Sequence, residues 1–295
     1  MYEGIITPIV TPFNRDNKQK INYNATEQLI NHLINKGVTG IFILGSNGEF
    51  HVLSHTEKIE FAKRVVKIVD SRVPVFAGTG ACYTGEVVTL SKEMEDIGVD
   101  ALSIVTPYFI QPSNEEILNY YETIAKNVKI PIILYNIPKN TGCNIAPNTV
   151  ESLSQIDNIC GIKDSSGDMD NLKSYIEAAK DQNFDVLVGS DSKIIDGYKM
   201  GATGAIAGTS NVITDVVVSL FKLLKSGEVK KAEELQNDID VLRNVLKLGT
   251  VPSILKRSVE LANISPVGLA RKPVNEPSEQ VDEKILEMLS HYELV

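Results

Sequence analysis

Short apolar, β-branched runs alternate with amphipathic stretches along most of the chain, and this alternation constrains the fold more than any other feature. It is typical of β–α–β units built on a parallel sheet. The runs cover residues 5–10, 40–44, 75–78, 101–105, 132–136, 160–163, 186–189 and 205–207. Eight such units predict an α/β fold, the (β/α)8 or TIM barrel. A doubly wound open sheet is the competing architecture, because periodicity alone does not show that a sheet closes.

Sequence signals for the start of a helix occur between the predicted strands, as eight β–α units require. Ser54 and Ser113 each precede a glutamate by three residues, which is capping-box spacing, and Pro147 suits a first helical turn. After about residue 225 the strand pattern stops, and helical stretches follow at 227–243, 251–262 and 281–289. We therefore expect a catalytic barrel at residues 1–225 and a C-terminal helical extension at residues 226–295.

Composition excludes several classes of protein. No apolar run approaches the roughly 18 residues that a membrane span needs. Glu3 and the early prolines Pro8 and Pro12 oppose a secretory signal, so a cytoplasmic protein is expected. A net charge of -9 without a dense basic cluster opposes nucleic-acid binding. The 3 cysteines are scattered, as expected of reduced thiols that serve packing.

Lys163 is the first candidate for chemistry, because barrel active sites lie at the C-terminal ends of strands and Lys163 ends the sixth run. Burial disfavours the charged form of an amine, and a neutral amine attacks ketones. Tyr135 lies near the end of the preceding run, where a phenol can move protons beside an imine-forming lysine. The alternatives are a rim lysine paired with Asp164 and a core tyrosine with a satisfied hydroxyl.

The second run ends in the turn Gly45-Ser46-Asn47-Gly48-Glu49. Its glycines let backbone N–H groups approach an anion, and the Ser46 hydroxyl adds a donor, so the turn suits a carboxylate. Alone it is weak support, because Gly-Ser turns are common in such loops.

Two other patterns are set aside. The run Gly78-Thr79-Gly80 begins like a dinucleotide-binding loop, but Tyr83 occupies its last glycine position. His51 and His55 have the spacing of metal ligands on a helix, yet the capping box at Ser54 places them across a helix start.

Together these motifs resemble the dihydrodipicolinate synthase / N-acetylneuraminate lyase superfamily of class I pyruvate-dependent aldolases. The resemblance covers essentially the whole chain and is carried by Gly4-Ile5-Ile6-Thr7-Pro8, Thr11-Pro12-Phe13, Gly45-Ser46-Asn47-Gly48-Glu49, Tyr135-Asn136-Ile137-Pro138, Thr141-Gly142 and Gly161-Ile162-Lys163-Asp164-Ser165-Ser166-Gly167-Asp168. It implies that Lys163 forms a Schiff base, that Tyr135 moves protons with Ser46, and that Ser46 and Asn47 hold the 2-oxo acid carboxylate. It also implies a homotetramer, a dimer of dimers, that uses no cofactor and no metal.

Four positions depart from the patterns of particular members. Asn47 replaces a usual threonine, Asn140 replaces the arginine of the synthases, and Phe109 replaces their second tyrosine. Asp191 lacks the following glutamate that is typical of the lyases. The motifs are more similar to those of 4-hydroxy-2-oxoglutarate aldolases and partly to those of 2-keto-3-deoxygluconate aldolases. The expected substrate-binding residues are Ser46, Asn47, Asn140, Ser165, Gly189 and Asp191.

The sequence therefore predicts a carbon–carbon lyase that cleaves or forms a 4-hydroxy-2-oxo acid from pyruvate and an aldehyde. One alternative is 4-hydroxy-tetrahydrodipicolinate synthase, which condenses pyruvate with aspartate semialdehyde. An alternative of another class is a non-catalytic regulatory barrel that binds a 2-oxo acid.

Overall fold

The computed structural model describes residues 2–295. Its eight strands follow one another in the order of a closed barrel. The pair β1–β2 and the successive pairs from β3 to β8 are parallel. The strands are β1 (Gly4–Pro8), β2 (Gly40–Ile43), β3 (Val75–Gly78), β4 (Ala101–Val105), β5 (Ile132–Asn136), β6 (Ile159–Asp164), β7 (Asp185–Val188) and β8 (Gly204–Ile206). The predicted TIM barrel is confirmed, and the open doubly wound sheet is excluded.

The bounds of β3, β4 and β5 are those predicted, and the bounds of the other strands differ from the predicted ones by one or two residues. The first strand was predicted to continue to Val10 but ends at Pro8, although the Ile9 amide still donates to the Phe42 carbonyl at 3.0 Å. The sixth strand is longer at both ends than predicted and includes Asp164. Such differences are ordinary, because side-chain patterns do not report where ladder hydrogen bonds stop.

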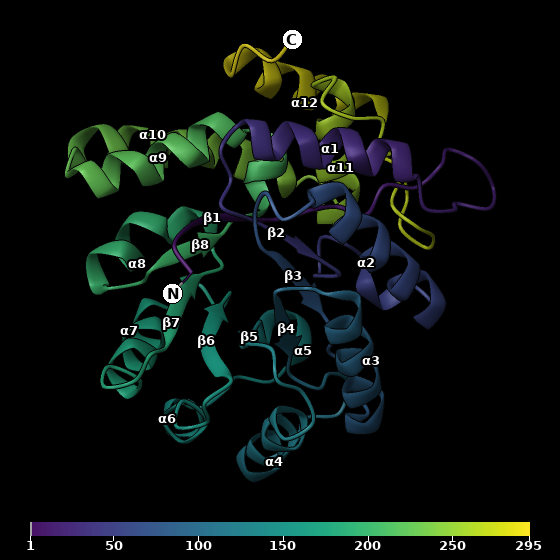
Figure 1. Cartoon of the computed structure of the whole chain (residues 1–295). Helices are drawn as coiled ribbons and strands as arrows, with labels where there is room; N and C mark the ends of the chain where they lie inside the picture. Colours follow the sequence, from purple (N-terminus) through teal and green to yellow (C-terminus); the bar gives the residue numbers. More distant parts are fainter. Residues whose placement is uncertain (1) are drawn as a thin grey trace. The chain divides into compact units, whose positions relative to one another are not determined.

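Contacts divide the described residues into two compact units, and residues 2–4 with 74–206 form the first. Figure 1 shows β5, β6 and β7 of this unit side by side, with α6 and α7 outside them. Its helices are α3 (Thr84–Ile97), α4 (Asn114–Ala125), α5 (Pro138–Thr141), α6 (Pro147–Leu153), α7 (Met169–Ala178), η2 (Asp191–Lys193) and α8 (Ile194–Met200).

The second unit comprises residues 5–73 and 207–295. Its helices are α1 (Tyr23–Asn35), η1 (Phe50–Val52), α2 (His55–Val69), η3 (Gly208–Asn211), α9 (Thr214–Ser226), α10 (Val229–Leu246), α11 (Val251–Leu261) and α12 (Glu279–His291). α9 and α10 run side by side (Figure 1). The helices predicted after residue 225 are thus present, and they group with the first part of the chain. The division into a barrel at 1–225 and an extension at 226–295 stays a prediction.

Local signals at the helix ends act as the sequence indicated. Ser54 and Ser113 both form complete capping boxes, and each cap stabilises its helix by about 1 kcal/mol. Pro147 is the first residue of α6. Gly98 and Gly201 end α3 and α8 with φ of 90° and 112°, a region that glycine enters without strain.

The glycine-rich run after β3 has a packing explanation. A Cβ atom on Gly80 would lie 2.5 Å from Val105 Cγ1 and 2.9 Å from the Val105 nitrogen, so only glycine fits beside β4. The Thr79 hydroxyl accepts a hydrogen bond from Ser91 of α3 at 2.9 Å. The run therefore joins β3 to its neighbours. Within residues 2–295, no helix combines the length and the apolar content needed to cross a bilayer.

Candidate active site

One row of side chains in the first unit contains both central candidates. The strand register pairs Val105 of β4 with Tyr135 of β5, Tyr135 with Lys163 of β6, and Lys163 with Leu187 of β7. Paired residues of parallel neighbours face the same side of a sheet. Tyr135 and Lys163 stand one residue before the ends of their strands, so they lie together at the C-terminal edge of the sheet.

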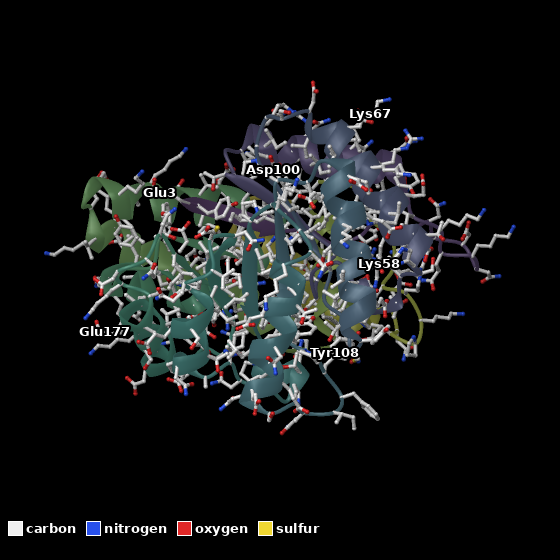
Figure 2. All side chains as sticks on the ribbon, turned by 60° about the horizontal axis from the view of Figure 1, so that its bottom comes forward. Glu3, Lys58, Lys67, Asp100, Tyr108 and Glu177 are labelled. Atoms are coloured by element: carbon white, nitrogen blue, oxygen red, sulfur yellow. The ribbon has the colours of Figure 1, made fainter. Side chains whose placement is uncertain are left out.

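The labelled residues Asp100 and Tyr108 in Figure 2 lie before and after β4, so Tyr108 marks the C-terminal end of this strand. Asp100 precedes β4 and accepts a hydrogen bond from the Val75 amide at 2.7 Å, whereas Tyr108 follows the strand at its other end. Tyr108 is half-buried, and this burial raises the pKa of its phenol. The next residue, Phe109, is 91% exposed and has a φ of 76°, which is unusual for a bulky side chain.

Lys163 and Tyr135 are both buried and in contact. Each is 4% exposed, and Lys163 Nζ lies 4.0 Å from the centroid of the Tyr135 ring. The face of the Tyr135 ring therefore packs against the head of the lysine side chain and restricts its position. A nucleophilic amine next to a phenol, both shielded from bulk water, is an arrangement that suits Schiff-base chemistry.

The two strand-end polar residues Asn136 and Asp164 form a buried network of their own. Adjacent residues of a strand point to opposite faces, so these side chains lie on the face away from Tyr135 and Lys163. Asn136 Nδ2 donates to Asp164 Oδ1 at 2.9 Å, and the Ile145 amide donates to Asn136 Oδ1 at 3.0 Å. Ser166 donates to Asp164 from its hydroxyl at 2.7 Å and from its amide at 3.1 Å.

This network bears on the alternative in which Lys163 pairs with Asp164 at the rim. The Asp164 carboxylate is buried and engaged by Asn136 and Ser166. The hydrogen bonds that Asp164 accepts from Asn136 and Ser166 connect the end of β6 to β5 and to the loop that follows β6. The structure therefore gives Asp164 a part in fixing the strand ends that carry the lysine and the tyrosine.

The loops after β6 and β7 bring Ser165 and Gly189 together. The Ser165 hydroxyl donates to the Gly189 carbonyl at 3.4 Å. A Cβ atom on Gly189 would lie 2.1 Å from Ser165 Oγ and 2.8 Å from the Asp164 carbonyl oxygen, so this approach requires glycine. Asp191 follows as the buried first residue of η2. Asn140 lies on the short helix α5 and is exposed.

The turn that carries Ser46 and Asn47 belongs to the second unit. Ser46 and Asn47 are partly exposed, whereas Gly48 and Glu49 are buried. The Glu49 amide donates to the Ser46 carbonyl at 3.1 Å, and the Thr11 hydroxyl donates to the Gly48 carbonyl at 2.6 Å. The turn is therefore rigidly supported, and its placement against Lys163 stays a prediction.

Sequence reasoning passed over the residues that support this turn. Glu49 and Lys256 form a buried ion pair in the second unit, and the partly exposed Arg271 donates its amide to Glu49. Only Glu49 lies within a recognised motif. The only signal in the sequence was that Lys256 lies among apolar residues of a helix near the C-terminus. A lysine at such a position is equally compatible with the surface, so its burial could not be predicted. Gln111 was also missed; its side chain lies against Gly142, where a Cβ atom would meet Nε2 at 2.8 Å.

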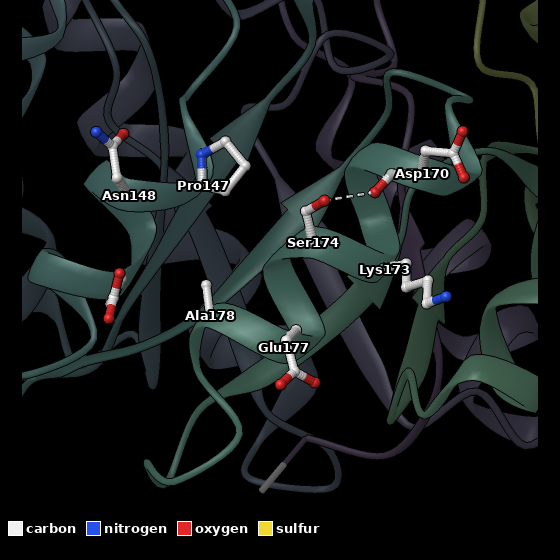
Figure 3. Close-up of a pocket in the computed structure, with 8 residues that line it drawn as sticks. Pro147, Asn148, Asp170, Lys173, Ser174, Glu177 and Ala178 are labelled. Carbon is white, nitrogen blue, oxygen red and sulfur yellow. Dashed lines mark hydrogen bonds between the residues drawn. The ribbon is translucent and has the colours of Figure 1, made fainter.

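A separate hollow lies between α6 and α7 (Figure 3). It is lined by Pro147, Asn148, Glu151, Asp170, Lys173, Ser174, Glu177 and Ala178. The Ser174 hydroxyl donates to the Asp170 carbonyl at 2.8 Å, as within an ordinary helix. All of its lining residues come from the helical layer, so it is distinct from the row of Tyr135 and Lys163.

Comparisons with known proteins give one consistent family. The model described as the dihydrodipicolinate synthetase family matches residues 1–292. The 4-hydroxy-tetrahydrodipicolinate synthase of Methanoculleus marisnigri is 34% identical over 98% of this chain and 97% of its own length. The protein of the same name from Methanopyrus kandleri is 36% identical over 97% of this chain and 94% of its own.

A solved structure is similar throughout. The YagE protein of E. coli K12, a prophage protein of the dihydrodipicolinic acid synthase family in complex with pyruvate, is 31% identical. It matches with a TM-score of 0.95 over 100% of both chains. The resemblance found in the sequence is thereby confirmed at the level of the family. The closer likeness to 4-hydroxy-2-oxoglutarate and 2-keto-3-deoxygluconate aldolases is not confirmed, because these relatives carry the name of the synthase alternative.

Proposed function

The chain belongs to the dihydrodipicolinate synthetase family, whose members are class I pyruvate-dependent aldolases, and we propose that it acts through a Schiff base between Lys163 and pyruvate. The observation that carries this proposal is the buried contact between Lys163 Nζ and the Tyr135 ring, 4.0 Å from the ring centroid. The amine attacks the C2 carbonyl carbon of pyruvate, and loss of water leaves an iminium. Loss of a C3 proton then gives an enamine, the carbon nucleophile.

Proton transfer is the role proposed for Tyr135. In the condensing direction the enamine carbon bonds to the aldehyde carbon, and the oxygen that gains the electron pair takes a proton from Tyr135. In the cleaving direction the iminium accepts the electrons of the breaking C3–C4 bond, while Tyr135, through Ser46, takes the C4 hydroxyl proton. We propose that the Ser46 hydroxyl and the backbone N–H of Asn47 hold the carboxylate of the 2-oxo acid, with Ser165, Gly189 and Asp191 near its distal part.

Two aldehydes are candidates for the second substrate. The names of the relatives favour aspartate semialdehyde, which would make the chain a 4-hydroxy-tetrahydrodipicolinate synthase. Specific residues favour the other candidate, the aldehyde of a 4-hydroxy-2-oxo acid. Asn140 stands where the synthases have an arginine for the second carboxylate, and an amide cannot replace its bidentate charged fork. Phe109 and Asn47 also remove two hydroxyl groups from the proton relay that the resemblance implies.

Trapping the Schiff base tests the shared chemistry. The protein is treated with borohydride in the presence of pyruvate, and the modified residue is located by peptide mass spectrometry. We expect one adduct, on Lys163, that disappears in Lys163→Ala and persists in Lys173→Ala, a control at an exposed lysine of α7. An adduct on another residue, or none, contradicts the mechanism and leaves the non-catalytic barrel as the leading alternative.

A substrate comparison then separates the two aldehydes. kcat/KM is measured for condensation of pyruvate with aspartate semialdehyde and for cleavage of a panel of 4-hydroxy-2-oxo acids. The variant Asn140→Arg is the matched test, because it restores the missing charge. A large gain of the variant with aspartate semialdehyde supports the aldolase assignment, whereas efficient condensation by the unmodified chain supports the synthase.

We also propose that the chain forms a homotetramer, as the family resemblance implies. Tyr83, Phe109 and Ile110 expose large apolar side chains in the loops after β3 and β4 of the first unit. Neighbouring exposed apolar side chains favour self-association. Light scattering is expected to give the mass of four chains, and a single-chain mass would contradict this proposal.

A further inference from the structure

A buried ion pair lies directly behind the Ser46–Asn47 turn. Lys256 of α11 is 0% exposed and Glu49 is 2% exposed, and Lys256 Nζ lies 2.6 Å from Glu49 Oε1. The other carboxylate oxygen, Oε2, accepts a hydrogen bond from the Arg271 amide at 2.8 Å. Glu49 is the last residue of the turn, so its side chain anchors the turn to the C-terminal part of the chain.

The environment of Lys256 holds its ammonium group in one place. Nζ donates to the Leu269 carbonyl at 2.9 Å and lies 4.0 Å from the centroid of the Phe13 ring. The Arg271 guanidinium lies over the same ring, with Cζ 4.4 Å from the centroid. Burial lowers the pKa of the Lys256 ammonium to about 8, against the attraction of Glu49. The group is therefore held by several partners yet is costly to keep charged.

The turn needs such an anchor because its backbone is strained at both ends. Leu44 and Glu49 have φ of 58° and 56°, in the left-handed region that favours glycine. A residue other than glycine is strained in this region and stays there only where its surroundings enforce the conformation. At Glu49 the enforcing contacts are the ion pair with Lys256 and the hydrogen bond from the Arg271 amide.

We infer that Lys256 is a positioning residue for 2-oxo acid binding, holding the Ser46–Asn47 turn in its binding conformation through its ion pair with Glu49. The inference rests on the proposed function, which gives that turn the carboxylate of the substrate. Stability alone is a weak reason for such a pair, because buried ion pairs are often replaced by apolar residues without loss of stability. A preorganised anion site, in contrast, depends on one fixed backbone conformation.

Three variants separate positioning from general stability. Lys256→Met removes the charge, and the double variant Lys256→Met with Glu49→Gln replaces the pair by neutral side chains of similar length. Arg257→Met is the matched control, because Arg257 is the next residue of α11 and its ion pair with Asp282 of α12 lies outside the turn. The measurement is the pyruvate dependence of borohydride trapping on Lys163, which gives a half-saturating concentration and a trapping rate at saturation.

We expect about a tenfold higher half-saturating pyruvate concentration in Lys256→Met and in the double variant, the factor that loss of one such interaction supports. The trapping rate at saturation stays within about twofold of the original, because Lys163 is intact and positioning acts on binding. Arg257→Met is expected to leave both quantities unchanged. Should Lys256→Met fail to fold, the double variant decides, since it leaves no unpaired charge buried.

The pH dependence of the half-saturating pyruvate concentration is a second test, because a purely structural role of Lys256 would not produce it. The charged groups that act on Lys256 are Glu49, Arg271 and Glu260. As pH rises through about 8, Lys256 loses its proton and Glu49 loses its counter-charge. The half-saturating concentration of the unmodified protein therefore rises toward that of Lys256→Met. The ratio of the half-saturating concentration of Lys256→Met to that of the unmodified protein therefore falls from about ten toward one as pH rises, whereas the ratio for Arg257→Met stays at one.

The outcomes distinguish this inference from the proposed function. If the unmodified protein forms no pyruvate adduct on Lys163, the proposed function is wrong and the inference falls with it. If that adduct forms but the Lys256 variants bind pyruvate like the unmodified protein, the proposed function stands and the inference alone is wrong. An equal loss of binding in Arg257→Met would show a general effect of destabilisation and would also overturn the inference.

Discussion

Asn136→Ala tests whether the hydrogen-bond network of Asn136 and Asp164 holds the proposed catalytic residues Tyr135 and Lys163 in place. Asn136 makes three side-chain hydrogen bonds: it donates to Asp164 and Asn144 and accepts from the Ile145 amide. Asn144 is exposed and can bind water instead, whereas the Ile145 amide and the Asp164 carboxylate are buried. The substitution therefore leaves two buried groups short of a partner.

The expected cost follows from these two groups. A buried polar group that loses its partner costs about 1–3 kcal/mol. Ile145 loses the partner of its amide, whereas Asp164 keeps the two hydrogen bonds from Ser166. We therefore expect the free energy of unfolding to fall by about 3 kcal/mol, in the lower half of the combined range of about 2–6 kcal/mol. Denaturant unfolding followed by two spectroscopic probes measures it, provided that the two transitions coincide.

The same substitution is expected to slow the chemistry. Asn136 follows Tyr135 in β5, and Asp164 follows Lys163 in β6, so loosening one pair shifts the other. A displacement of about 1 Å can cost up to a hundredfold in rate, and we expect trapping with borohydride and pyruvate to slow at saturation while still modifying Lys163. The control is Asn148→Ala, which removes an exposed amide from α6. If Asn136→Ala lowers the free energy of unfolding by less than about 1 kcal/mol and leaves the trapping rate at saturation unchanged, the reasoning is refuted.

Three further predictions concern other parts of the chain. Gly189→Ala places a Cβ atom 2.1 Å from Ser165 Oγ, so it should displace the loop after β6, cost about 1–3 kcal/mol and raise the KM for the 2-oxo acid; unchanged steady-state kinetics would contradict this. Arg271→Met removes the hydrogen bonds that lower the pKa of the Glu57 carboxyl. That stabilisation is present above the ordinary carboxyl pKa and is lost as pH falls through the lowered value. The gap in urea midpoints between Arg271→Met and the unmodified chain should therefore narrow between pH 7 and about pH 3.5, and a constant gap would argue against the linkage. Ser54→Ala removes an N-cap and should lower the free energy of unfolding by about 1 kcal/mol without changing kcat/KM; a kinetic effect would mean that α2 has a role beyond stability.

The sequence by itself determined the features that depend on neighbouring residues. The alternation of strand and helix patterns, the caps at Ser54 and Ser113, and Pro147 at the start of α6 are all local, so they could be predicted without knowledge of the packing. The place of Lys163 and Tyr135 was also predictable, since strand ends in a barrel share one edge and each residue lies near the end of a recognisable strand.

Only the tertiary structure decided how distant residues meet. The direction of the Asp164 side chain depends on the pairing of β5 with β6, and the tight approach of Ser165 to Gly189 depends on that of β6 with β7. The ion pair between Lys256 and Glu49 joins the two ends of the chain. No local pattern reports such a contact, because burial and pairing of a charge are set by what the rest of the chain packs around it.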